Sequence, residues 1–328
     1  MSPQPQPQPR TDAETLDVVY LCDALDLERI FGAALADVPG ARLVRPEDVT
    51  DPARIRAALS YRPAPGSFAR FPGLELVQCI AAGVDGILAD PSLSDDVTVA
   101  RVHARDQAET MAGFAAWQVV WHHRRMWRYL DNQRAGKWRR DGMKWLRPPR
   151  DVVVGVLGYG TMGRATARAI AAMGYDTRAA CSTARPADPG VTLVTGPEAI
   201  NDLAAQAEIL VNLLPLTPQT QDFLNADLFA RMPQGAALVQ LGRGEHLVEA
   251  DLLAALDSGH LAGASLDVFR TEPLAEGHPF WSHPAITVTP HEASLLPARA
   301  VAEALTQSLE DLRAGRRSRH AVNRQRGY

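Results

Sequence analysis

A glycine-rich turn between an apolar strand and a helix constrains the fold of this chain more than any other feature. The run 153–157 reads Val-Val-Gly-Val-Leu, and Gly158, Gly160 and Gly163 follow it at the spacing G-x-G-x-x-G, before the helix-like run 164–173. In a βαβ unit the first glycine allows the turn, the second admits a pyrophosphate, and the third lets the helix pack on the strand. We therefore predict dinucleotide binding, with a structural glycine turn or a methyltransferase-like nucleotide site as the alternatives.

Apolar runs alternate with helix-like segments along most of the chain, which is typical of parallel sheets covered by helices. The strands predicted after Asp151 are 152–157, 177–181, 191–194, 209–214, 236–241, 263–268 and 286–289. The N-terminal part repeats the pattern, with strands predicted at 18–21, 41–44, 57–61, 75–80 and 97–100. A long tryptophan-rich helix is predicted from Gln107 to about Ala135, and a last helix from Pro297 to about Leu312. The pattern predicts an α/β fold with parallel sheets.

The composition excludes several classes of protein. With 328 residues, 46% hydrophobic and 22% charged, and a net charge of −4, the chain has no general attraction for nucleic acid or anionic lipid. Its three cysteines are too scattered for a disulfide framework or a zinc site, so we expect no metal. Residues 1–10 lack the features of a signal peptide, and the apolar stretch 111–121 is too short to span a bilayer. We expect a cytoplasmic protein without a nucleic-acid or membrane partner, and disorder in residues 1–15.

Candidate ligand-binding residues lie where the predicted strands of the second half end. They are Gly158, Cys181, Pro215, Arg243, Asp267 and His291. Because the carboxyl ends of parallel strands meet at one edge of an open sheet, and ligands bind at that edge, we expect these loops to converge on one crevice.

Three of these loops carry groups suited to reducing a 2-oxo acid. Such a reduction needs a hydride donor, a proton for the developing alkoxide, and positive charge that holds the substrate. Arg243 stands between two glycines, which we expect to leave its approach unobstructed, and its planar fork matches a carboxylate. Histidine is the natural proton donor, since its ordinary pKa is about 6.5. We predict that Arg243 binds substrate, His291 is the acid/base, and Glu272 is the partner of His291.

Together these motifs resemble the D-isomer-specific 2-hydroxyacid dehydrogenase family, most closely its A-type glyoxylate/hydroxypyruvate reductases. The resemblance runs from about Val18 to the end of the chain. The segments that carry it are the glycine motif, 241–244, 251–259, 266–269, Glu272-Pro273, 279–284, 289–291 and 326–328.

The resemblance implies two Rossmann-like or flavodoxin-like domains with the active site in the cleft between them. Residues 1–104 plus 293–328 would form the substrate (catalytic) domain, and residues 105–292 the dinucleotide-binding domain. The loop of Ala82, Gly83 and Val84 would grip the substrate carboxylate through its backbone, with Asp267 near the nicotinamide carboxamide. The family also implies a homodimer and a small 2-oxo acid substrate such as glyoxylate or hydroxypyruvate. The residues expected to bind cofactor are Gly158, Tyr159, Gly160, Thr161, Met162, Gly163, Ser182, Thr183, Arg185, Leu214, Pro215, Leu241, Gly242 and Asp267.

The end of the second predicted strand bears on the choice of cofactor. NAD-preferring Rossmann domains place an acid there to bind the ribose 2′-hydroxyl. In this chain the position falls at Cys181, and Ser182, Thr183 and Arg185 follow with hydrogen-bond donors. We predict NADPH as the preferred cofactor, with NADH possible; a polar loop without any preference is the alternative.

Other functions on the same scaffold remain open. One is a nicotinamide-sensing, corepressor-like interaction protein, although retention of all three catalytic groups argues against it. Another is a different D-2-hydroxyacid substrate, or the oxidation of formate or phosphonate. Family members that oxidise formate pair the histidine with an amide, whereas Glu272 is a carboxylate.

Overall fold

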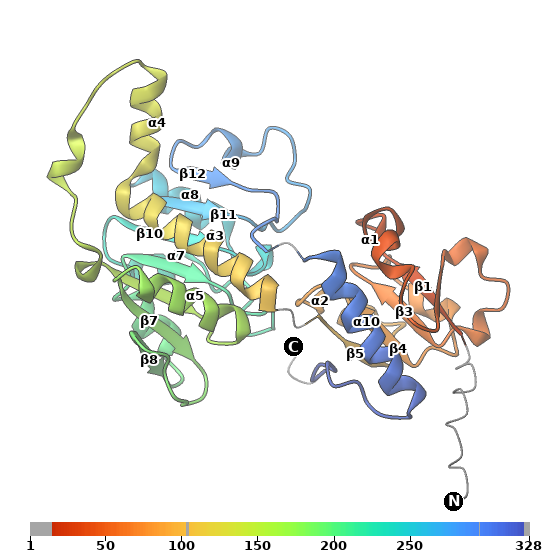
Figure 1. Ribbon diagram of the computed structural model, residues 1–328. Helices are drawn as coiled ribbons and strands as arrows, with labels where there is room; N and C mark the ends of the chain where they lie inside the picture. The colour runs from red at the N-terminus through yellow and green to blue at the C-terminus, as the bar shows by residue number, and fades with distance from the viewer. Residues whose placement is uncertain (1–14, 103–104, 295, 325–328) are drawn as a thin grey trace, which may run out of the picture. The chain divides into compact units, whose positions relative to one another are not determined.

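The computed structural model divides into two compact units, residues 1–103 with 296–328 and residues 104–295. Residues 15–102, 105–294 and 296–324 are described. Each unit is built on an all-parallel sheet, which confirms the α/β fold class (Figure 1). The disorder predicted for residues 1–15 concerns residues that, except for the last, lie outside the described part of the chain.

The second unit has a seven-stranded sheet in the order β12-β11-β10-β9-β6-β7-β8. Its strands are β6 (Val153–Leu157), β7 (Asp176–Cys181), β8 (Val191–Thr195), β9 (Ile209–Asn212), β10 (Ala236–Gln240), β11 (Leu261–Leu266) and β12 (Ile286–Val288). Every residue of β9 and β10 is buried, as expected of strands covered on both faces. The strand order reverses between β6 and β9, so the crevice of a doubly wound sheet is expected there.

Helices cover both faces of this sheet. They are α3 (Arg105–Arg124), α4 (Met126–Arg134), α5 (Thr161–Ala172), α6 (Ala199–Ala204), α7 (Ala226–Arg231), α8 (Glu249–Asp257) and α9 (Pro279–Ser282). One core joins the sheet to α3 and α5, and the other joins it to α6, α7 and α8. Burying each Leu or Val side chain of these cores contributes about 1.5–3 kcal/mol, so the two hydrophobic faces of the sheet hold the layers together.

The single long helix predicted from Gln107 to about Ala135 is wrong. The helix ends at Arg124 and restarts at Met126, because Arg125 has a left-handed backbone with a φ of 52°. The guanidinium of Arg125 lies over the ring of Trp145, 5.2 Å from its centroid, and holds this turn. In Figure 1 α4 therefore changes direction instead of continuing along α3.

The first unit has a five-stranded sheet in the order β2-β1-β3-β4-β5, which is the flavodoxin-like order. Its strands are β1 (Leu16–Leu21), β2 (Ala41–Val44), β3 (Ala57–Ser60), β4 (Leu76–Cys79) and β5 (Thr98–Ala100), and its helices are α1 (Leu27–Leu35), α2 (Asp85–Leu88) and α10 (Ala298–Arg313). Short 3₁₀ turns of the chain lie at Pro46–Asp48, Pro52–Arg54, Ser67–Arg70, Asp141–Lys144, Pro149–Asp151 and Gly244–His246.

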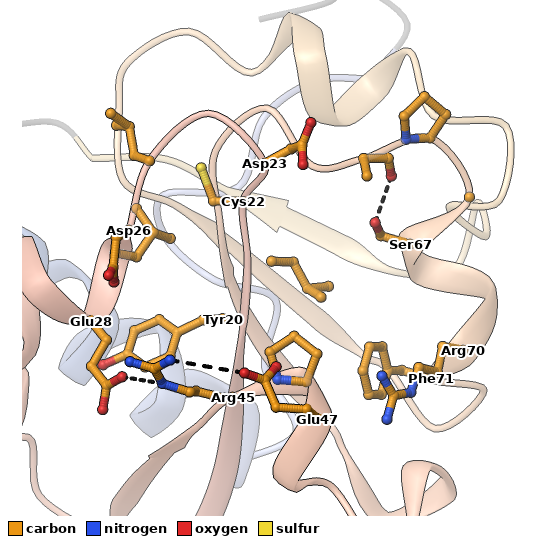
Figure 2. Close-up of a pocket in the computed structure, with 17 residues that line it drawn as sticks. Tyr20, Cys22, Asp23, Asp26, Glu28, Arg45, Glu47, Ser67, Arg70 and Phe71 are labelled. Carbon is orange, nitrogen blue, oxygen red and sulfur yellow. Dashed lines mark hydrogen bonds and ion pairs between the residues drawn. The ribbon is translucent and has the colours of Figure 1, made fainter.

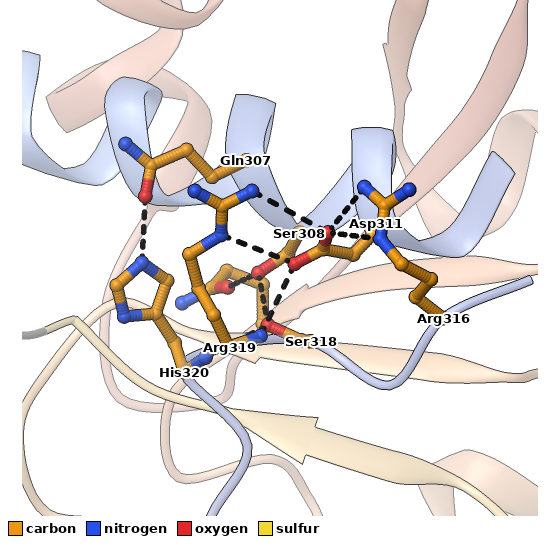
Figure 3. Close-up of polar contacts among 8 residues, drawn as sticks. Gln307, Ser308, Asp311, Arg316, Ser318, Arg319 and His320 are labelled. Carbon is orange, nitrogen blue, oxygen red and sulfur yellow. Dashed lines mark hydrogen bonds and ion pairs between the residues drawn. The ribbon is translucent and has the colours of Figure 1, made fainter. Parts of the chain in front are cut away.

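A buried carboxylate ties the C-terminal segment to this unit (Figure 3). Asp311 accepts hydrogen bonds from Arg316 Nη2 at 2.8 Å and from the backbone N–H of Arg319 at 3.1 Å. These arginines, Arg319 foremost, hold the pKa of Asp311 far below its usual range. Ser308 donates to Gln78 Oε1 in β4 at 2.7 Å, so α10 is fixed to the sheet by polar as well as apolar contacts.

No helix in the part of the chain that the structure describes is long and apolar enough to cross a membrane. Cys22, Cys79 and Cys181 form no disulfide bond with one another.

Candidate active site

The loops predicted to carry function line one edge of the seven-stranded sheet. Gly158 follows β6 directly, Asp267 follows β11 directly, and Cys181 is the last residue of β7. Arg243 and His291 lie three residues after the ends of β10 and β12. Because these strands are neighbours in one parallel sheet, their loops converge as the sequence indicates.

The glycine-rich loop has the geometry of a phosphate cradle. Gly158 has a φ of 94°, a left-handed conformation that favours glycine. A Cβ on Gly163 would lie 1.8 Å from the carbonyl oxygen of Gly158, so this position must be glycine for α5 to pack on β6. A Cβ on Gly160 would meet no atom within 4 Å, and no side chain caps α5 at this residue. The loop and the helix N-terminus that begins at Thr161 therefore fit the pyrophosphate of a dinucleotide.

The loop after β7 presents exposed donors next to the glycine-rich loop. Ser182, Thr183 and Arg185 are all exposed. Arg185 Nη1 donates to the carbonyl oxygen of Tyr159 at 3.2 Å, which places its guanidinium beside the glycine motif. Cys181 is the last residue of β7, and NAD-preferring Rossmann domains place an acid at the end of the second strand.

Asp188 anchors this loop, and sequence reasoning missed it. Its carboxylate accepts two hydrogen bonds of 2.9 Å from Arg164 in α5 and one from the hydroxyl of Tyr159. Arg164 and Tyr159 lower the pKa of Asp188 to about 2. Because a lone acid in an exposed Pro-Ala-Asp-Pro-Gly segment has no distinguishing pattern, only the fold reveals this contact.

His291 and Glu272 form a hydrogen-bonded pair. His291 Nδ1 lies 2.9 Å from Glu272 Oε2, and Glu272 Oε1 accepts from the backbone N–H of Phe269 at 3.0 Å. The side chain of His291 is 30% exposed, whereas that of Glu272 is 14% exposed. With Nδ1 engaged by the carboxylate, Nε2 is the ring nitrogen that can exchange a proton with a ligand.

Asp267 holds the backbone of the loop that carries His291. Its Oδ1 accepts from Thr289 Oγ1 at 2.6 Å and from the N–H of Glu292 at 3.0 Å, and its Oδ2 accepts from the N–H of Ala293 at 2.9 Å. Burial raises the pKa of this carboxyl, while the same hydrogen bonds oppose the rise. The resemblance implies a place near the nicotinamide carboxamide for Asp267; the structure shows what its oxygen atoms bind within the protein.

The glycines beside Arg243 allow close packing of neighbouring loops. The unobstructed approach to Arg243 that the sequence suggests stays a prediction. A Cβ on Gly244 would lie 1.9 Å from the carbonyl carbon of Phe269, and one on Gly242 would lie 2.8 Å from His246 Nδ1. Arg243 itself donates through Nη1 to the carbonyl oxygen of Gly242 at 2.8 Å.

Ala82, Gly83 and Val84 lie in the first unit, in the turn between β4 and α2. Arg101 Nη1 donates to the carbonyl oxygen of Ala82 at 3.1 Å, and the Cys79 thiol donates to that of Gly83 at 3.3 Å. Their role in substrate binding stays a prediction.

Comparison with known proteins agrees with this geometry. Residues 116–293 match the family model described as D-isomer specific 2-hydroxyacid dehydrogenase, NAD binding domain. The chain belongs to the D-isomer-specific 2-hydroxyacid dehydrogenase family. Within the residues that the structure describes, no group of three or more His, Cys, Asp or Glu side chains could hold a metal ion.

Several solved structures of this dehydrogenase family are similar over nearly the whole chain. The enzyme from Xanthobacter autotrophicus Py2, in complex with NADPH and MES, is 38% identical with a TM-score of 0.87, covering 96% of this chain and 100% of its own. A family protein from Klebsiella pneumoniae 342 is 36% identical with a TM-score of 0.86, covering 96% and 99%. The NADPH-dependent glyoxylate/hydroxypyruvate reductase from Sinorhizobium meliloti, in complex with NADP and sulfate, is 32% identical with a TM-score of 0.88, covering 95% and 100%.

A separate hollow of about 500 Å³ lies in the first unit of this dehydrogenase (Figure 2). Tyr20 and Cys22 line it, and Arg45 forms ion pairs there with Glu28 and Glu47. The residues that line this hollow include none of those predicted to bind cofactor or substrate, so it is distinct from the loops described above.

Proposed function

We propose that this dehydrogenase reduces small 2-oxo acids, glyoxylate or hydroxypyruvate, to the corresponding 2-hydroxy acids with NADPH. The observation that carries the proposal is the hydrogen bond of 2.9 Å between His291 and Glu272, on the same sheet edge as Arg243 and the glycine-rich loop. The similarity to the Sinorhizobium meliloti glyoxylate/hydroxypyruvate reductase supports this substrate class.

Each of the three side chains has a separate task in this reaction. Arg243 binds the carboxylate of the 2-oxo acid and polarises its carbonyl group. A bound reduced nicotinamide supplies the hydride to the carbonyl carbon. His291 gives the Nε2 proton to the oxygen of the developing alkoxide, and Glu272 holds the ring and stabilises its charged form. One 2-oxo acid, one reduced dinucleotide and one proton thus yield one 2-hydroxy acid and one oxidised dinucleotide.

The backbone N–H groups of Ala82, Gly83 and Val84 are our candidates for a further contact with the substrate carboxylate. Gly83→Pro removes one of these donors. It should raise the KM for the 2-oxo acid and leave the Kd for NADPH unchanged. An unchanged KM would remove this loop from the proposal.

The preference for NADPH rests on the loop after β7. Ser182, Thr183 and Arg185 are exposed where β7 ends, and Cys181 brings no acid that would repel a 2′-phosphate. A charge-assisted hydrogen bond contributes about 1.5–3 kcal/mol, which corresponds to about ten- to a hundredfold in affinity. The Xanthobacter and Sinorhizobium relatives were crystallised with NADPH and NADP, respectively. NADH should serve less well, and a higher kcat/KM with NADH would overturn this part of the proposal.

A screen of 2-oxo acids that follows the oxidation of NADPH and NADH tests the activity directly. Turnover of glyoxylate or hydroxypyruvate is expected, and Arg243→Gln should raise the KM for the acid because the variant loses the charge. Turnover only with another 2-oxo acid would correct the substrate. Tight dinucleotide binding without any turnover would favour a nicotinamide-sensing interaction protein instead.

We also propose that the dehydrogenase forms a homodimer and acts in the cytoplasm. Large apolar side chains are exposed along α3 and the segment after α4, including Trp138, which is 89% exposed, Met143 and Trp117. Trp138 and Met143 line the same hollow, and exposed apolar patches favour a protein partner. Light scattering should give twice the mass of the chain, and Trp138→Ser should shift the equilibrium toward the monomer. A monomeric wild type at micromolar concentration would exclude this assembly.

A further inference from the structure

A fully buried polar cluster lies beneath the Arg243 turn. Its members are Asn212 at the end of β9, Gln240 at the end of β10, and His246 in the 3₁₀ turn after Arg243, each with 0% exposure. Burying polar groups is costly unless their hydrogen bonds are satisfied. The specific bonds that this cluster makes therefore indicate what it does.

Both backbone polar groups of Arg243 are held by this cluster. The N–H of Arg243 donates to His246 Nδ1 at 3.2 Å, and its carbonyl oxygen accepts from Gln240 Nε2 at 2.9 Å. Gln240 Oε1 in turn accepts from Asn212 Nδ2 at 2.8 Å and from the N–H of Gly242 at 3.1 Å. The turn that presents the Arg243 guanidinium is thus fixed by side chains in addition to its own backbone bond, in which the N–H of His246 donates to the carbonyl oxygen of Arg243 at 3.1 Å.

The same imidazole reaches the neighbouring loop. His246 Nε2 lies 3.3 Å from the carbonyl oxygen of Pro215, a residue predicted to bind cofactor. Asn212 Oδ1 accepts from the N–H of Leu214 at 3.1 Å, which fixes that loop a second time. His246 therefore bridges the loop after β9 and the loop after β10.

The donors around His246 determine its proton arrangement. Nδ1 faces two donors, the N–H of Arg243 and Asn212 Nδ2 at 2.9 Å, so Nδ1 must be an acceptor. The ring proton then lies on Nε2 and points to an acceptor, the carbonyl oxygen of Pro215. Only this neutral tautomer satisfies all three contacts.

We propose that His246 is a positioning residue, which sets the Arg243 turn through Nδ1 and the Pro215 loop through Nε2. The proposal rests on the proposed function insofar as Arg243 binds the substrate. Gly242 supports it, because a Cβ at this position would lie 2.8 Å from both His246 Nδ1 and Asn212 Nδ2. The backbone at Gly242 packs closely against the His246 ring, so a substitution of His246 should alter the conformation of the Arg243 turn.

Two substitutions separate the two functions of the ring. In His246→Asn the side-chain oxygen takes the place of Nδ1, so the contact with Arg243 is kept and the contact with Pro215 is lost. In His246→Gln the side-chain amide reaches the place of Nε2, so the contact with Pro215 is kept and the contact with Arg243 is lost. His122→Asn is the matched control, because His122 is also buried and bonds to Ser265 in β11, beneath a different part of the sheet.

Enzyme kinetics and hydrogen exchange report the effects. In His246→Gln we expect the KM for the 2-oxo acid to rise about tenfold, the Kd for NADPH to stay within about twofold, and amide exchange at residues 241–244 to accelerate. In His246→Asn we expect the exchange at 241–244 to stay slow, and any weakening to fall on NADPH binding. The control should lower the Tm without changing the KM or the exchange at 241–244.

The outcomes distinguish this inference from the proposed function. Equal changes in both His246 variants, or changes shared with the control, would show a merely structural role and overturn the inference. The exchange at 241–244 and the NADPH titration need no turnover, so they decide the inference even if the wild type reduces none of the 2-oxo acids tested. That last result would overturn the proposed function alone.

Discussion

The carboxyl edge of the seven-stranded sheet has two halves that are built differently. On the side of β10, β11 and β12, the loops with Arg243 and His291 are held by side chains that are almost fully buried, among them Asp267 and His246. On the side of β7, the loop from Ser182 to Pro189 is largely exposed, and Arg185 and Asp188 attach it to the glycine motif and to α5.

We expect this difference in construction to separate the chemical step from the choice of cofactor. Buried hydrogen bonds are costly to remove, because a buried polar group left without a partner destabilises the fold by about 1–3 kcal/mol. Exposed charged contacts contribute less to stability. Substitutions on the β10–β12 side should therefore reduce turnover strongly. Substitutions on the β7 side should change which dinucleotide is preferred, with little effect on the chemical step.

His291→Ala should have the largest effect. Loss of the proton donor should lower kcat for the 2-oxo acid about 10²- to 10⁴-fold. The Kd for NADPH, measured by fluorescence titration, should stay nearly constant because the variant leaves the glycine-rich loop intact. A kcat close to that of the wild type would remove His291 from the chemistry. The assignment of the chemical step to the β10–β12 side would then be wrong.

Asp267→Asn should have the next largest effect. The amide offers one acceptor where the carboxylate uses two, so at least one contact with Thr289, Glu292 or Ala293 is lost and the His291 loop loosens. We expect kcat to fall about ten- to a hundredfold. Glu249→Gln is a control on the same unit, because the carboxylate of Glu249 pairs with His278. If steady-state kinetics gave the same kcat for Asp267→Asn and the wild type, Asp267 would have no role in positioning the His291 loop.

Arg185→Ala should change cofactor choice alone. Its loss removes an exposed cation from the loop after β7, so the ratio of kcat/KM for NADPH over NADH should fall about tenfold. kcat at saturating cofactor should change little. A drop in kcat with an unchanged ratio would mean that the two halves of the edge are not separate.

Asp188→Asn should have the smallest effect and a characteristic pH dependence. The pKa of Asp188 is lowered to about 2, so its ion pair with Arg164 stabilises the folded state above the ordinary Asp pKa of about 3.9 and is lost as the pH falls toward 2. The Tm difference between wild type and variant should be constant from neutral pH to about pH 5 and shrink below it. Calorimetry that found a difference growing toward acid pH would contradict this assignment.

The sequence predicted the sheets well because their strands are short, almost wholly apolar and separated by clear turns. The strand ends were close enough to place Gly158, Arg243 and His291 on one edge. The break at Arg125 was missed because the helical pattern continues across it, and the left-handed backbone of Arg125, whose guanidinium lies over Trp145, is visible only in the structure.

The supporting residues of the site escaped prediction for a related reason. His246, Gln240 and Asp188 act through contacts with residues that are distant along the chain, or through the backbone of a neighbouring loop. No spacing rule marks such residues. The candidate catalytic residues Arg243, Glu272 and His291, in contrast, belong to motifs with a fixed order, so the sequence alone could propose them.

The contact at Gly244 has a mechanical consequence. Its backbone touches that of Phe269, whose N–H is bound to Glu272, and Glu272 in turn holds His291. Arg243, proposed to bind the substrate carboxylate, and His291, proposed to protonate the carbonyl oxygen, are therefore linked by a short series of direct contacts between the loops after β10, β11 and β12. In the proposed reaction these contacts would set the distance between the carboxylate-binding group and the proton donor.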